Sequence, residues 1–172
     1  WMAKQCAPGG DALMAATASE TDGLTGILTG LGSLTYGELA GERMKLGLMI
    51  HDPEEEHDCF SDNTHNAHAG DAQGIRNVYL GSYTRTDGSV VSGPSVSDLV
   101  RAKSPEADQA VRAALDRTTA QMNALVHRAE TVEAYDQMIG LGNAEGNAMV
   151  RKTVETLVAQ AKELERAIAA LN

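Results

Sequence analysis

Residues 150–171, VRKTVETLVAQAKELERAIAAL, decide the fold class. Apolar side chains recur there at steps of four and three residues, beginning with Val150, Val154 and Leu157. This spacing places them on one face of an α-helix, and the charged residues fall mostly on the opposite face. The segment therefore predicts a long amphipathic helix that packs against other helices.

A second helix is expected before it, over residues 105–128. Ser104 is a favourable N-cap, and the proline that follows occupies the first helical position, where its missing N–H costs nothing. Ser95 and Asp98 are spaced as a capping box, which predicts a short helix over residues 95–103. The second half of the chain is therefore predicted to be largely helical.

The first half predicts further helices, over residues 11–20, 24–31, 34–50 and 63–81. The second and third of these contain several glycines, among them Gly26, Gly37 and Gly47. Glycine destabilises a helix interior by about 1 kcal/mol relative to alanine, so we expect close approach of a neighbouring helix or of a ligand there. Asp87-Gly88, between two short alternating stretches, predicts a β-hairpin.

Composition agrees with helix. Aromatic residues make up only 3% of the chain, and leucine and alanine are plentiful, which favours helices over strands. We predict an all-α protein: one antiparallel, up-down helical bundle over residues 1–172, with a long central acidic and histidine-rich loop and a short hairpin. Residues 1–6 resemble the end of a helix that Pro8 and two glycines stop, so we expect the chain to begin inside a longer protein.

Charge excludes several classes of partner. The 172 residues carry 14 Lys and Arg against 24 Asp and Glu, a net charge of −10. This balance disfavours nucleic acid and anionic lipid as partners. No apolar run approaches the ~20 residues that span a bilayer.

The two cysteines, Cys6 and Cys59, permit one internal disulfide, and their spacing leaves open whether it forms.

Residues 51–68 hold four of the five histidines, six carboxylates and no Lys or Arg. Imidazole and carboxylate together are the ligands of zinc, iron, manganese and copper. His57 and His65, with Asp62 between them, would converge on a metal ion if the loop folds back. His65 and His68 would share one face of a helix. The alternative is a solvated acidic loop in which Asp62 and its neighbours cap the helix that follows.

Two other groupings carry weaker signals. If residues 37–44 are helical, Glu38 and Glu42 share a face, with Arg43 beside them. An arginine there would fix the carboxylates or hold an anionic ligand, and a plain surface ion pair is equally compatible. His127 begins a His-x-x-Glu pair on a helix, a spacing that surface residues also show.

Five stretches, in order, carry a resemblance to a known family: residues 32–44 (GSLTYGELAGERM), 56–65 (EHDCFSDNTH), 74–81 (GIRNVYLG), 93–99 (GPSVSDL) and 135–139 (YDQMI). With these stretches the chain resembles the C-terminal half of imelysin-like proteins, in particular the branch called iron-regulated protein A. The resemblance implies an all-helical protein of two related bundles. It further implies export to the periplasm or outer membrane of a Gram-negative bacterium, and a link to iron acquisition.

The resemblance also implies a site between the two halves, to which this chain supplies one wall. The residues we place on that wall are Glu42, Arg43, His57, Ser61, Asp62 and His65. The expected partner is the N-terminal half of the same protein, or a companion chain. The family's Gly-x-His-x-x-Glu hallmark belongs to the N-terminal half, and here Leu125 stands where the glycine would precede His127.

Three functions remain open at this point. The first is binding of a metal ion, iron or zinc, or of a small ligand, in the service of iron uptake, with His57, Asp62 and His65 as metal ligands. The second is a metal-dependent peptidase that uses a metal-activated water, since imelysins have been classed as metallopeptidases. The third is a scaffold half that holds no ligand of its own.

Overall fold

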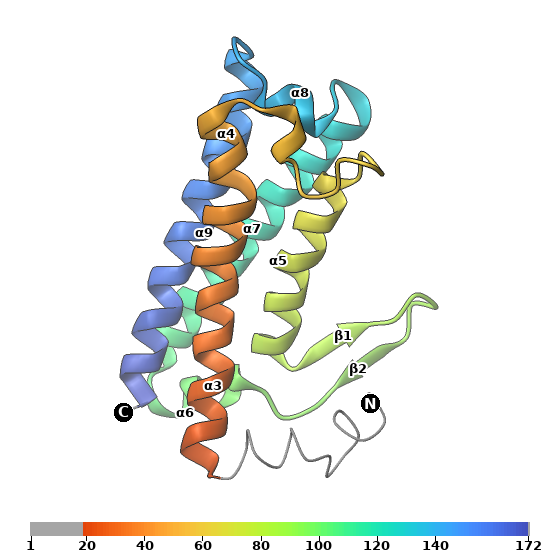
Figure 1. The fold of residues 1–172 in the computed structure, drawn as a ribbon. Helices are drawn as coiled ribbons and strands as arrows, with labels where there is room; N and C mark the ends of the chain where they lie inside the picture. The colour runs from red at the N-terminus through yellow and green to blue at the C-terminus, as the bar shows by residue number, and fades with distance from the viewer. Residues whose placement is uncertain (1–18, 172) are drawn as a thin grey trace.

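The computed structural model describes residues 19–171, which form an antiparallel helical bundle with one small hairpin (Figure 1). In chain order the elements are α3 (Glu20–Ser33), the π-helix η1 (Leu34–Lys45), α4 (Leu46–Ile50), the 3-10 turn η2 (Pro53–Glu55), α5 (Thr64–Leu80), β1 (Ser82–Thr84), β2 (Val90–Ser92), α6 (Val96–Lys103), α7 (Pro105–Thr131), α8 (Tyr135–Ile139) and α9 (Ala144–Leu171). The long segments alternate in direction, as predicted for an up-down bundle. The predicted all-α fold is therefore confirmed.

Helices α3, η1 and α4 form one continuous rod beside α9 (Figure 1). Ser33 and Lys45, at the two junctions, keep right-handed helical dihedral angles. In a π-helix each N–H bonds one residue further back than in an α-helix, so side chains on one face lie further apart in sequence. The buried residues Thr35, Leu39 and Met44 follow steps of four and five accordingly. The helix expected over residues 34–50 is confirmed, but most of it has a different register.

The core forms two clusters along the bundle axis. One lies toward α4 and α8 and includes Leu39, Met44, Met122, Tyr135, Ile139 and Leu157. The other lies toward α6 and includes Leu28, Ile75, Tyr79, Val100, Leu115 and Leu164. Helices α7 and α9 contribute to both clusters, which is why the final apolar stripe of the sequence spans the length of the bundle.

The local signals of the second half are confirmed. The Ser104 side chain accepts from the N–H of Ala107 at the start of α7, and Ser95 and Asp98 form both bonds of a capping box on α6. The hairpin pairs Ser82 with Ser92 in an antiparallel register. The helix expected over residues 11–20 falls largely outside the described residues.

Most helix glycines do not mark close packing, contrary to our expectation. A methyl group built at Gly26 or Gly37 would meet no atom within 4 Å. Gly47 is the exception among those named from the sequence, because a methyl group there would lie 3.2 Å from Cδ1 of Ile139. At the C-terminal end of α5, Gly81 has φ of 61°, and a methyl group built there would lie only 2.7 Å from Cβ of Ser95, so both its backbone and its surroundings require glycine.

Candidate functional site

The acidic and histidine-rich segment crosses one end of the bundle and joins α4 to α5 (Figure 1). It leaves α4 at His51, whose φ of 55° lies in the left-handed region and whose Nδ1 lies 2.8 Å from the carbonyl oxygen of Ile139. Asp62, just before α5, also has a positive φ, of 50°. Such angles are uncommon outside glycine and are held by the surrounding structure.

His68 lies on α5 beneath this segment and has no exposed surface. Neither of its ring nitrogens has a hydrogen-bond partner. The ring meets that of Tyr135 edge-on, with centroids 5.2 Å apart, and lies 6.3 Å from the ring of His57. Burial, followed by the nearby His57, Arg43 and His65, lowers the pKa of His68 to about 3. His68 is therefore a neutral imidazole with a free lone pair at physiological pH.

Glu56 brings a carboxylate from the loop into the same region. Its exposed fraction is 6%, and its Oε2 has no hydrogen-bond partner. Burial raises its pKa, the Thr64 hydroxyl opposes this by hydrogen bonding, and Asp62, Asp136 and Asp58 raise the pKa further. The loop therefore buries a carboxyl group among other carboxylates.

Tyr135, the first residue of α8, completes the group. It is 1% exposed, and its hydroxyl has no hydrogen-bond partner. Burial and the charge of Glu56 raise its pKa, so the phenol stays protonated. We call Glu56, His57, His65, His68 and Tyr135 the histidine cluster. It draws on the loop, α5 and α8.

The histidine cluster concentrates unmet hydrogen-bonding capacity. Among the described residues, seven buried side-chain polar atoms have no partner, and five of them belong to Glu56, His65, His68 and Tyr135. Leaving a buried polar group unpaired costs about 1–3 kcal/mol, and native proteins keep such groups rare. A set of them in one place is typical of a site that a bound ion, small molecule or ordered water completes.

Arg43 borders the cluster and is already paired. Its guanidinium donates to Asp71 at 2.7 Å and to Glu38 at 2.9 Å. Glu38 lies five residues before Arg43, the spacing that the π-helix brings onto one face. Glu42, which α-helical spacing would have placed with Glu38, is exposed. The predicted grouping of Arg43 with a carboxylate is therefore present, with Glu38 and Asp71 as its members.

Two residues predicted for the site, His57 and His65, belong to the cluster. His57 is exposed, and His65 is half-buried with its Nδ1 unpartnered. Ser61 is exposed and donates to the carbonyl of Asp58 at 3.2 Å, a contact within the loop. Cys59 is exposed, and Cys6 lies outside the described residues, so their pairing stays a prediction.

Sequence reasoning did not select the buried members of the cluster. Glu56, His68 and Tyr135 were all visible in the pattern, since His68 shares a helix face with His65 and the other two belong to stretches of the resemblance. In the described part of the chain, no three His, Cys, Asp or Glu side chains are arranged to hold a metal ion. The ligand set His57, Asp62 and His65 accordingly stays a prediction.

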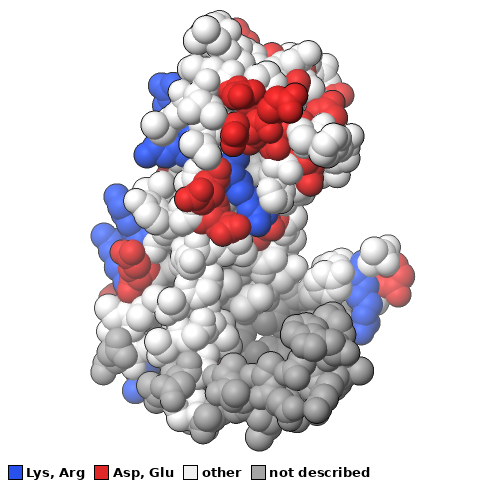
Figure 2. Space-filling model, in the orientation of Figure 1, with Lys and Arg blue, Asp and Glu red and all other residues white. Residues whose placement is uncertain are grey.

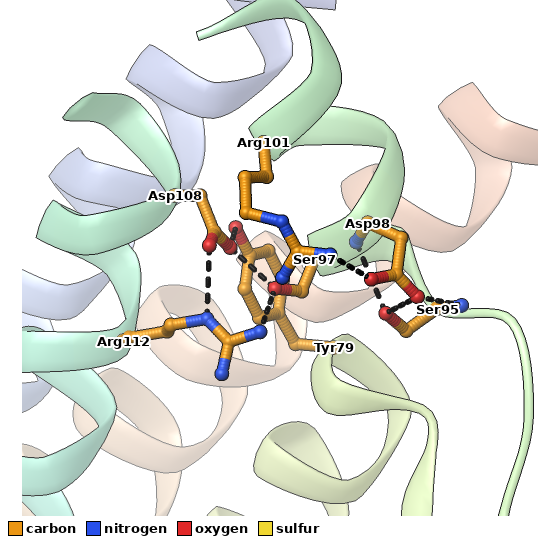
Figure 3. Close-up of polar contacts among 7 residues, drawn as sticks. All are labelled: Tyr79, Ser95, Ser97, Asp98, Arg101, Asp108 and Arg112. Atoms are coloured by element: carbon orange, nitrogen blue, oxygen red, sulfur yellow. Dashed lines mark hydrogen bonds and ion pairs between the residues drawn. The ribbon is translucent and has the colours of Figure 1, made fainter. Parts of the chain in front are cut away.

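A second buried polar group lies at the opposite end of α5 and is fully paired (Figure 3). We call Tyr79, Ser97, Asp108 and Arg112 the serine cluster. Asp108 accepts from the Tyr79 hydroxyl at 3.1 Å, from Nε of Arg112 at 2.9 Å and from the Ser97 hydroxyl. Nη2 of Arg112 donates to Ser97 at 2.5 Å. These bonds join α5, α6 and α7, so the serine cluster is a structural joint.

The comparisons with known proteins bear on this geometry. The family model described as Imelysin (Peptidase M75) matches residues 1–164. The chain belongs to the imelysin family. No curated protein matches it in sequence. Among the described residues, no helix is both long enough and apolar enough to cross a membrane.

The stretches that carried the resemblance to imelysins meet at the two clusters. Arg43, the pair Glu56–His57 and Tyr135 come from three of them and meet in or beside the histidine cluster. The remaining two supply Tyr79 and Ser97 to the serine cluster. In this chain the five stretches therefore serve one structural joint and one candidate site.

Proposed function

We propose that this imelysin-family chain binds a metal ion or small ligand at the histidine cluster, in an exported protein that serves iron acquisition. The observation that carries the proposal is the burial of Glu56, His68 and Tyr135 with free polar atoms in one cluster. A group of side chains kept only for stability would be paired or apolar. Their unmet hydrogen bonds are the binding capacity that a ligand uses.

The charge around the cluster supports a cationic ligand. Acidic side chains gather at the end of the bundle that carries α4 and α8 (Figure 2). Asp58, Asp62 and Asp136 all act on Glu56, whereas the nearby Arg43 is paired with two carboxylates. The local field therefore attracts a cation and disfavours an anion.

The upstream half of an imelysin, or a companion chain, would cover this end of the bundle. Phe60 in the loop is fully exposed, and Leu141, between α8 and α9, is 84% exposed. Large apolar side chains at such positions are typical of an interface with another domain. A contact there would also exclude water from the histidine cluster.

The periplasm or outer membrane as location, and the link to iron, come from the resemblance to the iron-regulated branch of the family. An oxidising compartment would also permit the pairing of Cys6 and Cys59. Cell fractionation, together with protein levels in iron-replete and iron-limited cultures, tests both parts. Protein in the cytoplasmic fraction, at a level that iron does not change, would contradict them.

A metal-dependent peptidase is the second candidate, because one observation favours it. Glu56 is a buried carboxyl group of raised pKa beside histidines, and a general base needs such a pKa. Hydrolysis of a peptide library that requires added metal and is lost in Glu56→Gln would establish this activity. Absence of such hydrolysis would leave the binding and scaffold functions.

The experiment for the binding function is native mass spectrometry of the purified chain, with elemental analysis of the same sample. We expect a bound mass in the wild type, at one per chain, that His68→Leu lacks. The matched control is His127→Ala, which changes an exposed histidine of α7. A wild type with no bound mass, from iron-replete and iron-limited cultures alike, would refute ligand binding and leave the scaffold function.

A further inference from the structure

We propose that the cavity between α4 and α9 binds a small organic anion with an apolar body, such as a medium-chain carboxylate. The cavity has a volume of about 430 Å³, within the range of pockets that hold small molecules. Its walls come from the end of η1, from α4 with the residue that follows it, and from the first half of α9. It shares no residue with the histidine cluster, so it is a site beyond the proposed function.

Much of the cavity lining is apolar. Leu48 of α4 is buried in the core, and Val154 of α9 packs partly buried against the same core. Met49 also lines the cavity and is exposed, so its flexible thioether side chain is free to adapt to a ligand. Such a surface favours the hydrocarbon part of a ligand, because both leave water when they meet.

Two cations from different elements line the same cavity. Lys45 is the last residue of η1, and Arg151 lies on α9. Within residues 19–171 neither of them forms an ion pair, whereas most arginines in that range do. Glu155 follows Arg151 at the spacing of a helical ion pair, and the two side chains are not paired. Cations beside one cavity repel each other, and an anion bound near both offsets that repulsion.

The charge of the cavity is opposite to that of the whole chain. The chain carries a net charge of −10, but Lys45 and Arg151 outnumber Glu155, the one carboxylate of the lining. Figure 2 shows basic side chains along the edge of the bundle that α9 forms, and acidic side chains gathered toward the loop. The local field at α9 therefore favours an anion, in contrast to the field at the histidine cluster.

Two polar side chains of the lining are already held in place. Nδ1 of His51 lies 2.8 Å from the carbonyl oxygen of Ile139. The amide of Asn147 donates to the carbonyl of Met138 at 2.7 Å and to that of Gly140 at 3.1 Å. These bonds tie the wall to α8 and the residue after it. A ligand therefore meets a largely formed cavity, and binding requires little reordering of the protein.

The test is isothermal titration calorimetry of the purified chain with octanoate. We expect one octanoate per chain with a dissociation constant of about 0.1–1 mM, as a ligand of this size allows. Octanol lacks the charge and acetate lacks the apolar body, so each should bind roughly tenfold more weakly or worse. An acetylated pentapeptide that ends in leucine presents a similar carboxylate at a chain terminus. Tighter binding of that peptide than of octanoate would overturn the assignment to a small molecule.

Four exposed residues of this region supply the variants. Lys45→Gln and Arg151→Gln should each weaken octanoate binding by about tenfold, the effect of losing one charge-assisted hydrogen bond. Lys152→Gln is the matched control, because Lys152 is the next residue of α9 and does not line the cavity. Glu155→Gln removes the carboxylate of the lining and should strengthen binding by about threefold. Thermal unfolding confirms that each variant keeps its fold.

Three results would overturn the anion site. The first is no octanoate binding at millimolar concentration, and the second is equal binding of octanol and octanoate. The third is an equal loss of affinity in Lys152→Gln and Arg151→Gln. Binding that Arg151→Gln leaves intact and His68→Leu abolishes would assign the anion to the histidine cluster, which also overturns the proposal for the cavity.

Discussion

The two ends of α5 carry buried polar groups of opposite character. Near its C-terminus, Tyr79 donates to Asp108 within the fully paired serine cluster. Near its N-terminus, the side-chain polar atoms of His68 and of the neighbouring Tyr135 on α8 have no hydrogen-bond partner. Both tyrosines are buried, with exposed fractions of 0% for Tyr79 and 1% for Tyr135. One helix thus shows that this fold can satisfy a buried polar group, which makes the unsatisfied group at its other end a feature that a ligand explains.

Removal of Asp108 should have the largest effect on stability. Asp108→Ala leaves Tyr79, Ser97 and Arg112 without their shared acceptor, and breaking a buried ion pair costs about 3–5 kcal/mol. We expect about 3 kcal/mol, because the Arg112 side chain is 42% exposed and water partly replaces the carboxylate.

Urea unfolding measures this change. Asp116→Ala on the same helix is the control, because it removes a surface pair with Arg76 and should cost at most about 1 kcal/mol. Equal losses in the two variants would show that the serine cluster is no structural joint.

Ligand addition should stabilise the histidine cluster specifically. If the ligand of the proposed function is a metal ion such as Zn²⁺, free ion at about 100 times its dissociation constant should raise the free energy of unfolding by about 2.7 kcal/mol. His68→Leu should show no such rise. Chemical unfolding with and without Zn²⁺ measures both, and a chelator should reverse the effect. An equal rise in the variant would place the metal elsewhere.

The two buried tyrosines allow the most direct comparison of the clusters. Tyr79→Phe removes a hydrogen bond to Asp108 and should lower the free energy of unfolding by about 1 kcal/mol. Tyr135→Phe removes a hydroxyl that has no partner, so in ligand-free protein its stability should be unchanged or higher. A similar loss in both variants would mean that Tyr135 has a partner in solution and would weaken the case for a ligand site.

The smallest effect is expected from Asp98, beside the serine cluster. The Ser95 hydroxyl, and after it Arg101, lower the pKa of Asp98 in the folded protein (Figure 3). The unfolded chain binds this proton at higher pH than the folded chain, so the contribution is present above about pH 4 and is lost on acidification. In Asp98→Asn the free energy of unfolding, measured as a function of pH, should therefore fall slightly less on acidification than in the wild type. An unchanged pH dependence would contradict the capping role.

Much of the fold could be predicted from the sequence, because its signals are local. Ser104 with the following proline, the Ser95–Asp98 box and the Asp87-Gly88 turn each specify structure within a few residues. Regular apolar spacing specified the long helices in the same way. Open space around Gly26 and Gly37 could not be anticipated, since it depends on what the rest of the bundle leaves uncovered.

The candidate site was only partly predictable. The loop and its His57 and His65 were found from composition, whereas Tyr135 reaches His68 only through packing of α8 against the bundle. The π-helix was not predicted either. An α-helix would place Glu38 next to Glu42, whereas the longer i to i+5 spacing of the π-helix places Glu38 next to Arg43.

The sequence by itself determined an all-α, up-down bundle of the imelysin family, with an acidic and histidine-rich loop at one end. Helix periodicity and capping are properties of neighbouring residues, so they survive without knowledge of the whole fold. Only the tertiary structure decided which polar groups are buried and which of those have partners. Burial and hydrogen bonding join residues distant in the chain, and it is those distant contacts that satisfied Tyr79 and left His68 free.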